Sequence, residues 1–454
     1  MVVPFLPLAE RDSFLSEKET ERVVEKIVSL CKRRGFVFQS SGIYGGINGC
    51  WDFGPMGVEL RRNIKNDWWY VFVHQRTDVC GLDASILMHP EVWVASGHVE
   101  QFHDMLVDCK VCKHRFREDQ LEGNRCPDCG GELTGPKAFN SMLKTRLGVS
   151  DDSSVDTYLR PETCQSIFVD FKEVYSSSRM KVPFGIAQVG KSFRNEVNTR
   201  NFIFRSREFE QMEIEFFCKA ADEEYWFEQW RQAIWQWYLD IGLQESKLRW
   251  FEHPKEALSH YSKRTLDVEY EFPFGWGELQ GLANRGTYDL TQHAAHSGKD
   301  LKFFDPDTKE SFVPSVIEPS AGVDRTCLAV LCDAYHEEEV EGETRVVLRL
   351  HPRLAPIKAG VFPLVKKDGL AEIARTLEQK LRKKFPTFYD QAGAIGRRYR
   401  RMDEVGTPFG ICIDYQTKED ETVTIRDRDT MQQVRVKMDE VADYVGKRCS
   451  SERG

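Results

Sequence analysis

The sequence predicts an α+β protein in which an antiparallel sheet flanked by helices forms the larger part and a separate α/β domain follows. Apolar and polar residues alternate on both sides of a polar loop in 189–217, which predicts a long antiparallel hairpin. Apolar residues recur at helical spacing in 16–34, 58–73 and 221–240. After His351, short apolar strands alternate with helices, which is typical of an α/β domain of about 100 residues.

Composition excludes several classes of protein. Of the 454 residues 41% are hydrophobic and 30% charged, and no apolar run reaches the ~18 residues of a spanning helix. Membrane, collagen-like and largely disordered proteins are therefore excluded. The N-terminal segment has neither a secretory nor an organelle-targeting pattern, so we expect a cytoplasmic protein without membrane contact. An odd number of cysteines, 13, favours reduced thiols and a metal site over a disulfide scaffold.

The charge is distributed unevenly along the chain. The net charge is −9, from 63 basic and 72 acidic residues, which argues against non-specific coating of nucleic acid and against DNA as a partner. Residues 351–454 hold 21 basic and 16 acidic residues, a local balance of +5. We expect any contact with a polyanion such as RNA to be concentrated at this end.

The hairpin at 189–217 carries the most informative polar residues of the chain. Its strands and loop present residues with distinct chemical uses: Arg194, Glu196, Arg205, Phe209 and Glu213. A guanidinium binds phosphate, a carboxylate accepts a hydrogen bond from an exocyclic amine, and an aromatic ring stacks on a purine. Charges on a hairpin are usually solvated, but this combination favours a nucleotide site.

A second segment, 314–334, combines a strand with a helix. Glu318 lies on the expected strand, Ser320 in a turn of small residues, and Arg325 in the first turn of the helix. An arginine beside a helix N-terminus is well placed to hold a polyphosphate.

These segments resemble the signature motifs of the class II aminoacyl-tRNA synthetases. Motif 2, Phe-Arg-x-Glu followed by Arg-x-x-x-Phe, is met by Phe193–Glu196 and by Arg205 with Phe209. Motif 3 ends in an arginine at the start of a helix, here Arg325. Motif 1, a dimer-interface helix and strand around a proline, resembles 52–73 with Pro55. Each pattern is degenerate alone, but their order and number make the set specific.

Within this class the amino-acid sequence resembles the homodimeric type of glycyl-tRNA synthetase over nearly the whole chain. The segments that carry the resemblance are IYGGINGCWDFGPMGVELRRNIKNDWW (43–69), LRPETCQSIF (159–168), the motif 2 hairpin, GLANRGTYDLTQH (281–293), EPSAGVDR (318–325) and VTIRDRDTMQQVR (423–435). The resemblance implies that the chain activates glycine with ATP to glycyl-adenylate and transfers glycine to the 3′ end of tRNA(Gly). It also implies a homodimer.

The resemblance also assigns roles in ATP binding. Arg194 would hold the α-phosphate and the attacking carboxylate, Glu196 the adenine amino group, and Phe209 the adenine ring. Arg205 and Arg325 would hold the β- and γ-phosphates. Two carboxylates, Glu318 and less surely Glu278, would bind Mg²⁺ with the phosphates. Arg194 and Arg325 are the expected catalytic residues, because the reaction needs positioning and charge neutralisation but no protein nucleophile.

Glycine has no side chain, so its pocket can only hold the ammonium group and fill the space of a side chain. By resemblance, Glu162, Glu213 and Ser320 form this pocket. Alanine would be excluded by a clash with a rigid wall, which costs about 1–3 kcal/mol.

Four cysteines predict a structural zinc site in an insertion that spans 105–155. They form two CxxC pairs: Cys109, Cys112, Cys126 and Cys129. Two such turns complete a tetrahedral set of four thiolates and leave no open ligand position. Four reduced cysteines without metal are the alternative.

The C-terminal part, 351–454, resembles the anticodon-binding domain of the glycyl, histidyl, prolyl and threonyl enzymes, and 1–350 would form the catalytic domain. Four arginines beside Tyr399 suit contact with phosphates and unpaired bases: Arg397, Arg398, Arg400 and Arg401. A solvated helix face would look similar.

Two other functions compete with this interpretation. A mitochondrial DNA polymerase accessory subunit shares the fold without aminoacylation, but such proteins lose the ATP-binding arginines that this chain keeps. A threonyl- or prolyl-type enzyme would need a side-chain pocket, and the threonyl type needs histidine ligands for a catalytic zinc, which the all-cysteine array does not supply.

Overall fold

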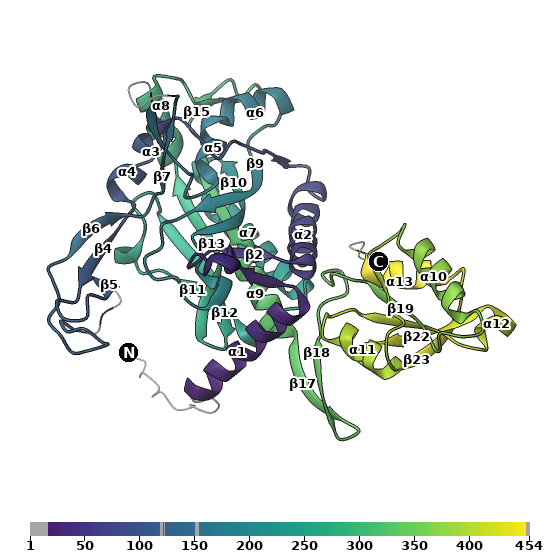
Figure 1. Ribbon diagram of the computed structural model, residues 1–454. Coiled ribbons are helices and arrows are strands. Elements are labelled where there is room, and N and C mark those ends of the chain that lie inside the picture. Colours follow the sequence, from purple (N-terminus) through teal and green to yellow (C-terminus); the bar gives the residue numbers. More distant parts are fainter. Residues whose placement is uncertain (1–16, 119–120, 122, 150–153, 451–454) are drawn as a thin grey trace, which may run out of the picture.

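The computed structural model describes residues 17–118, 121, 123–149 and 154–450, and its larger part is built on a seven-stranded sheet (Figure 1). The strand order is β11-β12-β13-β16-β10-β9-β3, and every neighbouring pair is antiparallel except β3 with β9. The strands are β3 (Val79–Gly81), β9 (Phe184–Phe193), β10 (Glu208–Cys218), β11 (Leu248–Glu252), β12 (Arg264–Phe272), β13 (Gly275–Gly286) and β16 (Ser315–Gly322). The predicted antiparallel sheet and the hairpin of β9 and β10 are confirmed.

The side chains of strand β10 alternate between a packed face and a polar face of the sheet. Met212, Ile214 and Phe216 point to a core formed with helices α2, α7 and α9. Intervening residues such as Glu213 point to the opposite face, because side chains alternate along a strand. The helices that accompany the seven-stranded sheet are α1 (Glu17–Arg34), α2 (Pro55–Trp69), α3 (Pro90–Ala95), α4 (His98–Gln101), α5 (Cys164–Val169), α6 (Phe171–Ser178), α7 (Glu223–Asp240), α8 (Tyr288–Ser297) and α9 (Val323–Ala334).

The three expected long helices are confirmed as α1, α2 and α7. Trp230 and Trp237 on α7 are each 1% exposed and pack in the main core, as their helical spacing predicts. Helix α2 begins at Pro55, whose missing N–H costs nothing at the first helical position. No helix among the described residues is long and apolar enough to cross a membrane.

Short strands form small sheets beside the main one. A three-stranded sheet in the order β5-β4-β6 leads into the cysteine-rich segment, and further two-stranded sheets pair β1 with β2, β7 with β8, β14 with β15 and β17 with β18. These strands are β1 (Val37–Gln39), β2 (Trp51–Phe53), β4 (His103–Asp108), β5 (Arg115–Arg117), β6 (Lys137–Asn140), β7 (Lys144–Leu147), β8 (Val155–Tyr158), β14 (Phe303–Phe304), β15 (Ser311–Phe312), β17 (Tyr335–Val340) and β18 (Glu343–Leu348).

A second sheet, in the order β20-β19-β21-β22-β23, forms the C-terminal part and has its own apolar core (Figure 1). Its elements are β19 (Ala359–Pro363), α10 (Leu370–Leu381), β20 (Thr387–Tyr389), α11 (Ile395–Asp403), β21 (Phe409–Ile413), α12 (Thr417–Asp420), β22 (Thr422–Asp427), β23 (Gln433–Lys437) and α13 (Val441–Cys449). Buried Arg345 on β18 donates to Asp403 on α11 at 2.9 Å and so ties this part to the β17–β18 hairpin.

Candidate active site

An open pocket of about 620 Å³ lies where the β9–β10 hairpin meets the start of α9. It is lined by residues of both predicted nucleotide-binding segments and by one residue of β13, Glu278: Arg194, Glu196, Ile203, Phe204, Arg205, Ser206, Phe209, Glu210, Gln211, Glu278, Ser320, Gly322, Asp324 and Arg325. The structure thus brings together six of the seven residues predicted to bind ATP. Glu318 does not line this pocket.

Among the arginines of the pocket, Arg194 is held by a backbone carbonyl and Arg205 lies near other cations. The guanidinium of Arg194 donates to the carbonyl of Pro161 at 3.0 Å and stands 5.4 Å from the ring centre of Phe209. Burial lowers the pKa of Arg205; Glu196 opposes this, and nearby cations such as Arg325 lower it further. Neighbouring cations repel one another, so a bound polyanion would relieve this repulsion.

Arg325 has one acidic partner in the pocket. Its Nη1 lies 2.9 Å from the Glu278 carboxylate, and its Nε donates to the carbonyl of Phe204 at 3.2 Å. The charge of Arg325 lowers the pKa of Glu278, so this carboxylate is ionised at neutral pH. An ionised and 46% exposed carboxylate beside a phosphate site fits the oxygen ligation that Mg²⁺ prefers.

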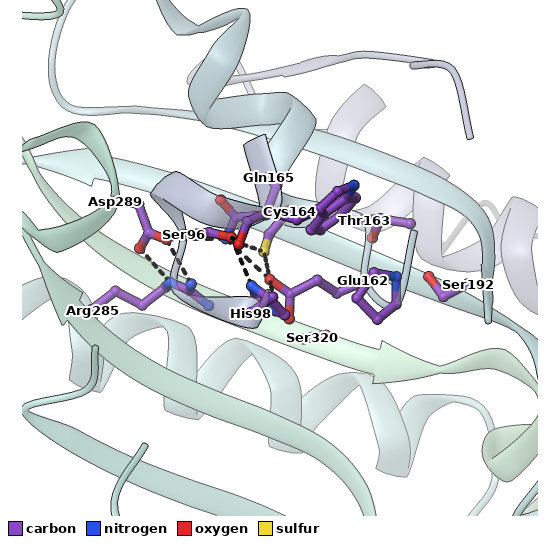
Figure 2. A network of polar contacts seen from close by, with 12 residues as sticks. Ser96, His98, Glu162, Thr163, Cys164, Gln165, Ser192, Arg285, Asp289 and Ser320 are labelled. Carbon is purple, nitrogen blue, oxygen red and sulfur yellow. Dashed lines mark hydrogen bonds and ion pairs between the residues drawn. The ribbon is translucent and has the colours of Figure 1, made fainter. Parts of the chain in front are cut away.

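Next to this pocket lies a buried group of acids, with Glu162 at its centre (Figure 2). The Glu162 carboxylate accepts hydrogen bonds from Cys164 Sγ at 2.8 Å and Gln165 Nε2 at 3.1 Å, and His98 Nε2 lies 3.2 Å away. Ser96 Oγ contacts the other ring nitrogen of His98 at 2.8 Å. Burial would raise the pKa of Glu162, but His98, Arg285 and the thiol together lower it well below its ordinary value.

Glu213 and Ser320 are paired residues of neighbouring strands. They lie opposite each other on β10 and β16. The Glu213 carboxylate accepts from the Thr163 N–H at 3.1 Å and from the Thr163 hydroxyl. Burial and the charge of Glu162 raise the pKa of Glu213, because a second buried anion is costly beside the first. The three residues predicted to bind glycine, Glu162, Glu213 and Ser320, thus lie close together, and the two acids are buried.

Glu318 belongs to this buried region and does not line the nucleotide pocket, so its ligation of Mg²⁺ stays a prediction. Both of its oxygens accept from Nη1 of Arg285, at 3.0 and 3.1 Å, and the residue is 7% exposed. Arg285 also donates to both oxygens of Asp289, at 2.8 and 2.9 Å. The sequence could not show this ion pair, because Arg285 and Glu318 lie on different strands. They meet only when β13 and β16 pair, with Glu318 opposite Ala283.

Several residues of the site were missed by the sequence interpretation. His98 and Thr163 contact the predicted glycine residues directly, and Arg285 contacts Glu318. An arginine and an aspartate four residues apart, Arg285 and Asp289, are a recognisable helical-type pair, but nothing local shows that both are 1% exposed. For His98 and Thr163 the sequence carries no distinguishing signal.

The four cysteines predicted to bind zinc converge. Their sulfurs all lie within 4.8 Å of one another, with 3.5 Å between Cys109 and Cys129 and 3.6 Å between Cys112 and Cys126. Four thiolates about 2.3 Å from one tetrahedral ion stand about 3.8 Å apart. The donor set and its geometry therefore fit a zinc ion with no open ligand position. Cys109 follows β4 directly, so the small sheet anchors the site.

The arginines of α11 differ in their surroundings. Arg398 is 3% exposed and donates to the carbonyl of Pro363 and, at 2.8 Å, to that of Gly393, so its predicted contact with tRNA is wrong. Arg401 binds Asp390 at 2.9 Å and the carbonyl of Ala392 at 2.7 Å. Arg400 is one-third exposed, 3.7 Å from Asp403, and Arg397 is exposed. A helix must bury one side against its sheet, so its arginines cannot all face solvent.

Comparison with known proteins defines the class. The anticodon binding domain family matches residues 358–448. A glycine–tRNA ligase of Treponema denticola is 54% identical over 433 residues, 93% of this chain and 96% of the relative. Those of Caldanaerobacter subterraneus and Streptomyces coelicolor are 54% and 52% identical and cover 93% and 94% of the chain and 97% and 98% of their own lengths. These relatives place the chain among the aminoacyl-tRNA ligases. Within that class, the chain belongs to the glycine–tRNA ligase family.

Proposed function

We propose that the chain activates glycine with ATP and transfers it to the 3′ end of tRNA(Gly). The observation that carries this proposal is the junction of the nucleotide pocket with the buried acids. Ser320 lines the nucleotide pocket and also lies opposite Glu213, which is 1% exposed. Gln211 Nε2 donates to Ser320 Oγ at 3.3 Å across the same junction. A substrate with an ammonium group at one end and a carboxylate at the other would bridge the two pockets.

In the nucleotide pocket, each polar group has an assigned part of ATP. Arg194 binds the α-phosphate and the incoming carboxylate. Phe209 stacks on the adenine, and Glu196 accepts a hydrogen bond from the adenine amino group. Arg205 and Arg325 bind the β- and γ-phosphates. When bound, Mg²⁺ would supply charge neutralisation for the phosphates, and Glu278 is the residue that would hold it.

In the acidic pocket, Glu162 and Glu213 bind the glycine ammonium and Ser320 Oγ accepts a further N–H. The ammonium stabilises the ionised form of Glu213, whose charge is costly without a cation. Buried neighbours such as Thr163, at 0% exposed, form a rigid wall close to the α-carbon. A methyl group would clash there, at a cost of about 1–3 kcal/mol against alanine.

The chemistry then requires positioning and charge stabilisation. A glycine carboxylate oxygen forms a bond to the α-phosphorus, and the bond from that phosphorus to the β-phosphate oxygen breaks, which releases pyrophosphate. Arg194 stabilises the charge on the α-phosphate while Arg325 and Arg205 stabilise the leaving group. The terminal hydroxyl of tRNA next attacks the glycyl carbonyl, and AMP leaves with the mixed-anhydride electron pair. No side chain acts as a nucleophile.

The remaining assignments concern the whole chain. We infer a class II catalytic domain in 1–350 with a zinc-binding insertion at 105–155, and an anticodon-binding domain in 351–454 that contacts tRNA through Arg397 and Arg400. We also infer a homodimer whose interface includes the connection between β1 and β2 and the face of α2, where Ile43 and Tyr44 are 89% and 87% exposed. Trp68 is 1% exposed in the layer beneath. A reducing, cytoplasmic location fits the cysteines, which are all free among the described residues.

Exchange between ATP and pyrophosphate tests the proposal, run separately with glycine, alanine, serine and threonine. We expect exchange with glycine only, and Arg194→Ala to lower its rate by about 10²–10³ because one charge-assisted contact to the transition state is lost. Circular dichroism verifies that the variant is folded. Exchange driven equally by alanine, or an Arg194→Ala protein of undiminished rate, would refute the assignment.

A further inference from the structure

The nucleotide pocket is lined by more carboxylates than arginines. Three arginines and four acids line it, and the acids include Glu210 on β10 and Asp324 in the first turn of α9. A lining with excess negative charge would repel a polyphosphate. Some cation outside the lining must therefore offset the acids if the pocket is to bind ATP.

Helix α2 supplies that cation from behind the pocket wall. Arg61 Nη2 lies 2.8 Å from Glu210 Oε2 and 2.8 Å from Asp324 Oδ1, so one guanidinium pairs with acids of two different elements. Its side chain is 14% exposed. On the next turn of α2, Lys65 Nζ lies 3.0 and 2.8 Å from the two oxygens of Glu210.

The guanidinium of Arg61 is held in place on its other side. Its carbon stands 4.0 Å from the ring centre of Phe53 on β2, a cation–π contact. Helices α2 and α9 pack directly against each other, which brings Arg61 to Asp324. Asp324 is the neighbour of Arg325 in the same helical turn, so its position bears on the position of that arginine.

We propose that Arg61 is a positioning residue for ATP: it neutralises Glu210 and Asp324 and thereby gives the nucleotide pocket the positive potential that the polyphosphate requires. This role rests on the proposed function of the pocket. Arg61 itself does not line the pocket, so it acts through the two carboxylates and not by contact with the nucleotide. Lys65 has a smaller part, because it pairs with Glu210 alone.

The test compares Arg61→Met with Arg62→Met, a substitution of the exposed arginine next to it on α2. Steady-state exchange gives the KM for ATP and for glycine, and calorimetry gives ATP binding without turnover. We expect Arg61→Met to weaken ATP binding and raise its KM about ten-fold, the size of one partly buried charge interaction. The KM for glycine should stay within about two-fold, and Arg62→Met should match the wild type.

A rescue experiment distinguishes charge neutralisation by Arg61 from a purely structural role of this residue. In Arg61→Met/Glu210→Gln/Asp324→Asn both acids lose their charge, so we expect ATP affinity to return to within about three-fold of the wild type. No recovery in a folded triple variant, or an unchanged KM in Arg61→Met, would overturn the proposal. If Arg61→Met does not fold, Lys65→Met carries the test, with an expected increase of about three-fold that Glu210→Gln reverses; no increase would overturn it. Wild-type protein that binds ATP but shows no glycine-dependent exchange would refute the proposed function while leaving this test intact.

Discussion

Glu213 on β10 lies opposite Ser320 on β16, and Ser320 also lines the nucleotide pocket, so the buried acids adjoin that pocket. The two residues are more than one hundred positions apart in the chain. The Glu213 carboxylate also accepts hydrogen bonds from the N–H and the hydroxyl of Thr163, which hold it in place. We propose that the glycine ammonium binds at this carboxylate.

Removal of the charge of either acid in this pocket should impair glycine binding selectively. We expect Glu162→Gln and Glu213→Gln each to raise the KM for glycine by about 30- to 100-fold, because a charge-assisted hydrogen bond is worth about 2–3 kcal/mol. The KM for ATP should change less than about three-fold. Glu208→Gln, at the exposed start of the same strand, is the matched control. Equal effects on both substrates would contradict the separation of the pockets.

Metal analysis should find one zinc ion per chain. Purification without chelator, followed by elemental analysis, measures it directly, and Cys126→Ser should abolish binding because three thiolates remain. Loss of the ion should also lower the melting temperature, since a structural site contributes to folding of the segment around it. Cys412→Ser, a buried cysteine of the second sheet, is a control that keeps the zinc. Protein free of any thiophilic metal would contradict the site.

The dimer should depend on the exposed apolar side chains between β1 and β2. Sedimentation should give about twice the 52.6 kDa of one chain. The double variant Ile43→Asp/Tyr44→Asp should sediment as single chains, because two buried carboxylates without partners oppose association. Val434→Asp, at an exposed position of β23, should remain dimeric. A single-chain mass for the wild type at micromolar concentration would refute the homodimer.

Neighbouring arginines of α11 should have opposite phenotypes. Arg397→Ala should leave stability unchanged and weaken tRNA binding a few-fold, with a smaller salt dependence because one phosphate contact is lost. Arg398→Ala should destabilise the protein by about 2–4 kcal/mol, because the buried carbonyl of Pro363 and the carbonyl of Gly393 lose their donor. Urea unfolding and charging kinetics at two salt concentrations distinguish them. The reverse pattern would show that Arg398 is exposed in solution.

Stability should fall at mildly acidic pH through His293. Burial lowers its pKa to about 4, while Asp289 opposes the shift, and its Nε2 contacts Gln165 Oε1 at 2.8 Å. Its stabilising contribution is complete above the unfolded pKa of about 6.5 and is lost as the pH falls towards 4, because the unfolded chain takes up the proton first. Between pH 7 and pH 5 this amounts to about 2 kcal/mol. Urea unfolding of His293→Gln should show a correspondingly weaker pH dependence.

Local patterns were sufficient for many elements. The hairpin of β9 and β10, helix α7 and the strands β19, β21, β22 and β23 were predicted correctly, because alternation and helical spacing are properties of consecutive residues; the short strand β20 was not predicted. The cysteine pairs likewise follow from spacing alone, since each CxxC turn already orients two thiolates.

The position of Glu318 outside the nucleotide pocket has a non-local cause. Its motif places it near phosphate-binding residues in sequence, but its partner Arg285 comes from another strand, and their ion pair is fixed only when β13 and β16 align. The error for Arg398 is similar, because which side of α11 faces its sheet depends on packing against Phe362 and its neighbours.

From the sequence alone we predict the chemical groups of the site and their order: arginines suited to phosphate, a ring suited to adenine, acids suited to an ammonium group and four thiolates. These follow from residue type and short spacing. Only the tertiary structure decided which of them meet. It placed Ser320 opposite Glu213, enclosed Arg285 between Glu318 and Asp289, and set Arg61 behind the nucleotide pocket. The physical reason is that strand register and helix packing are set by the burial of apolar surface across the whole chain, and no local window contains that information.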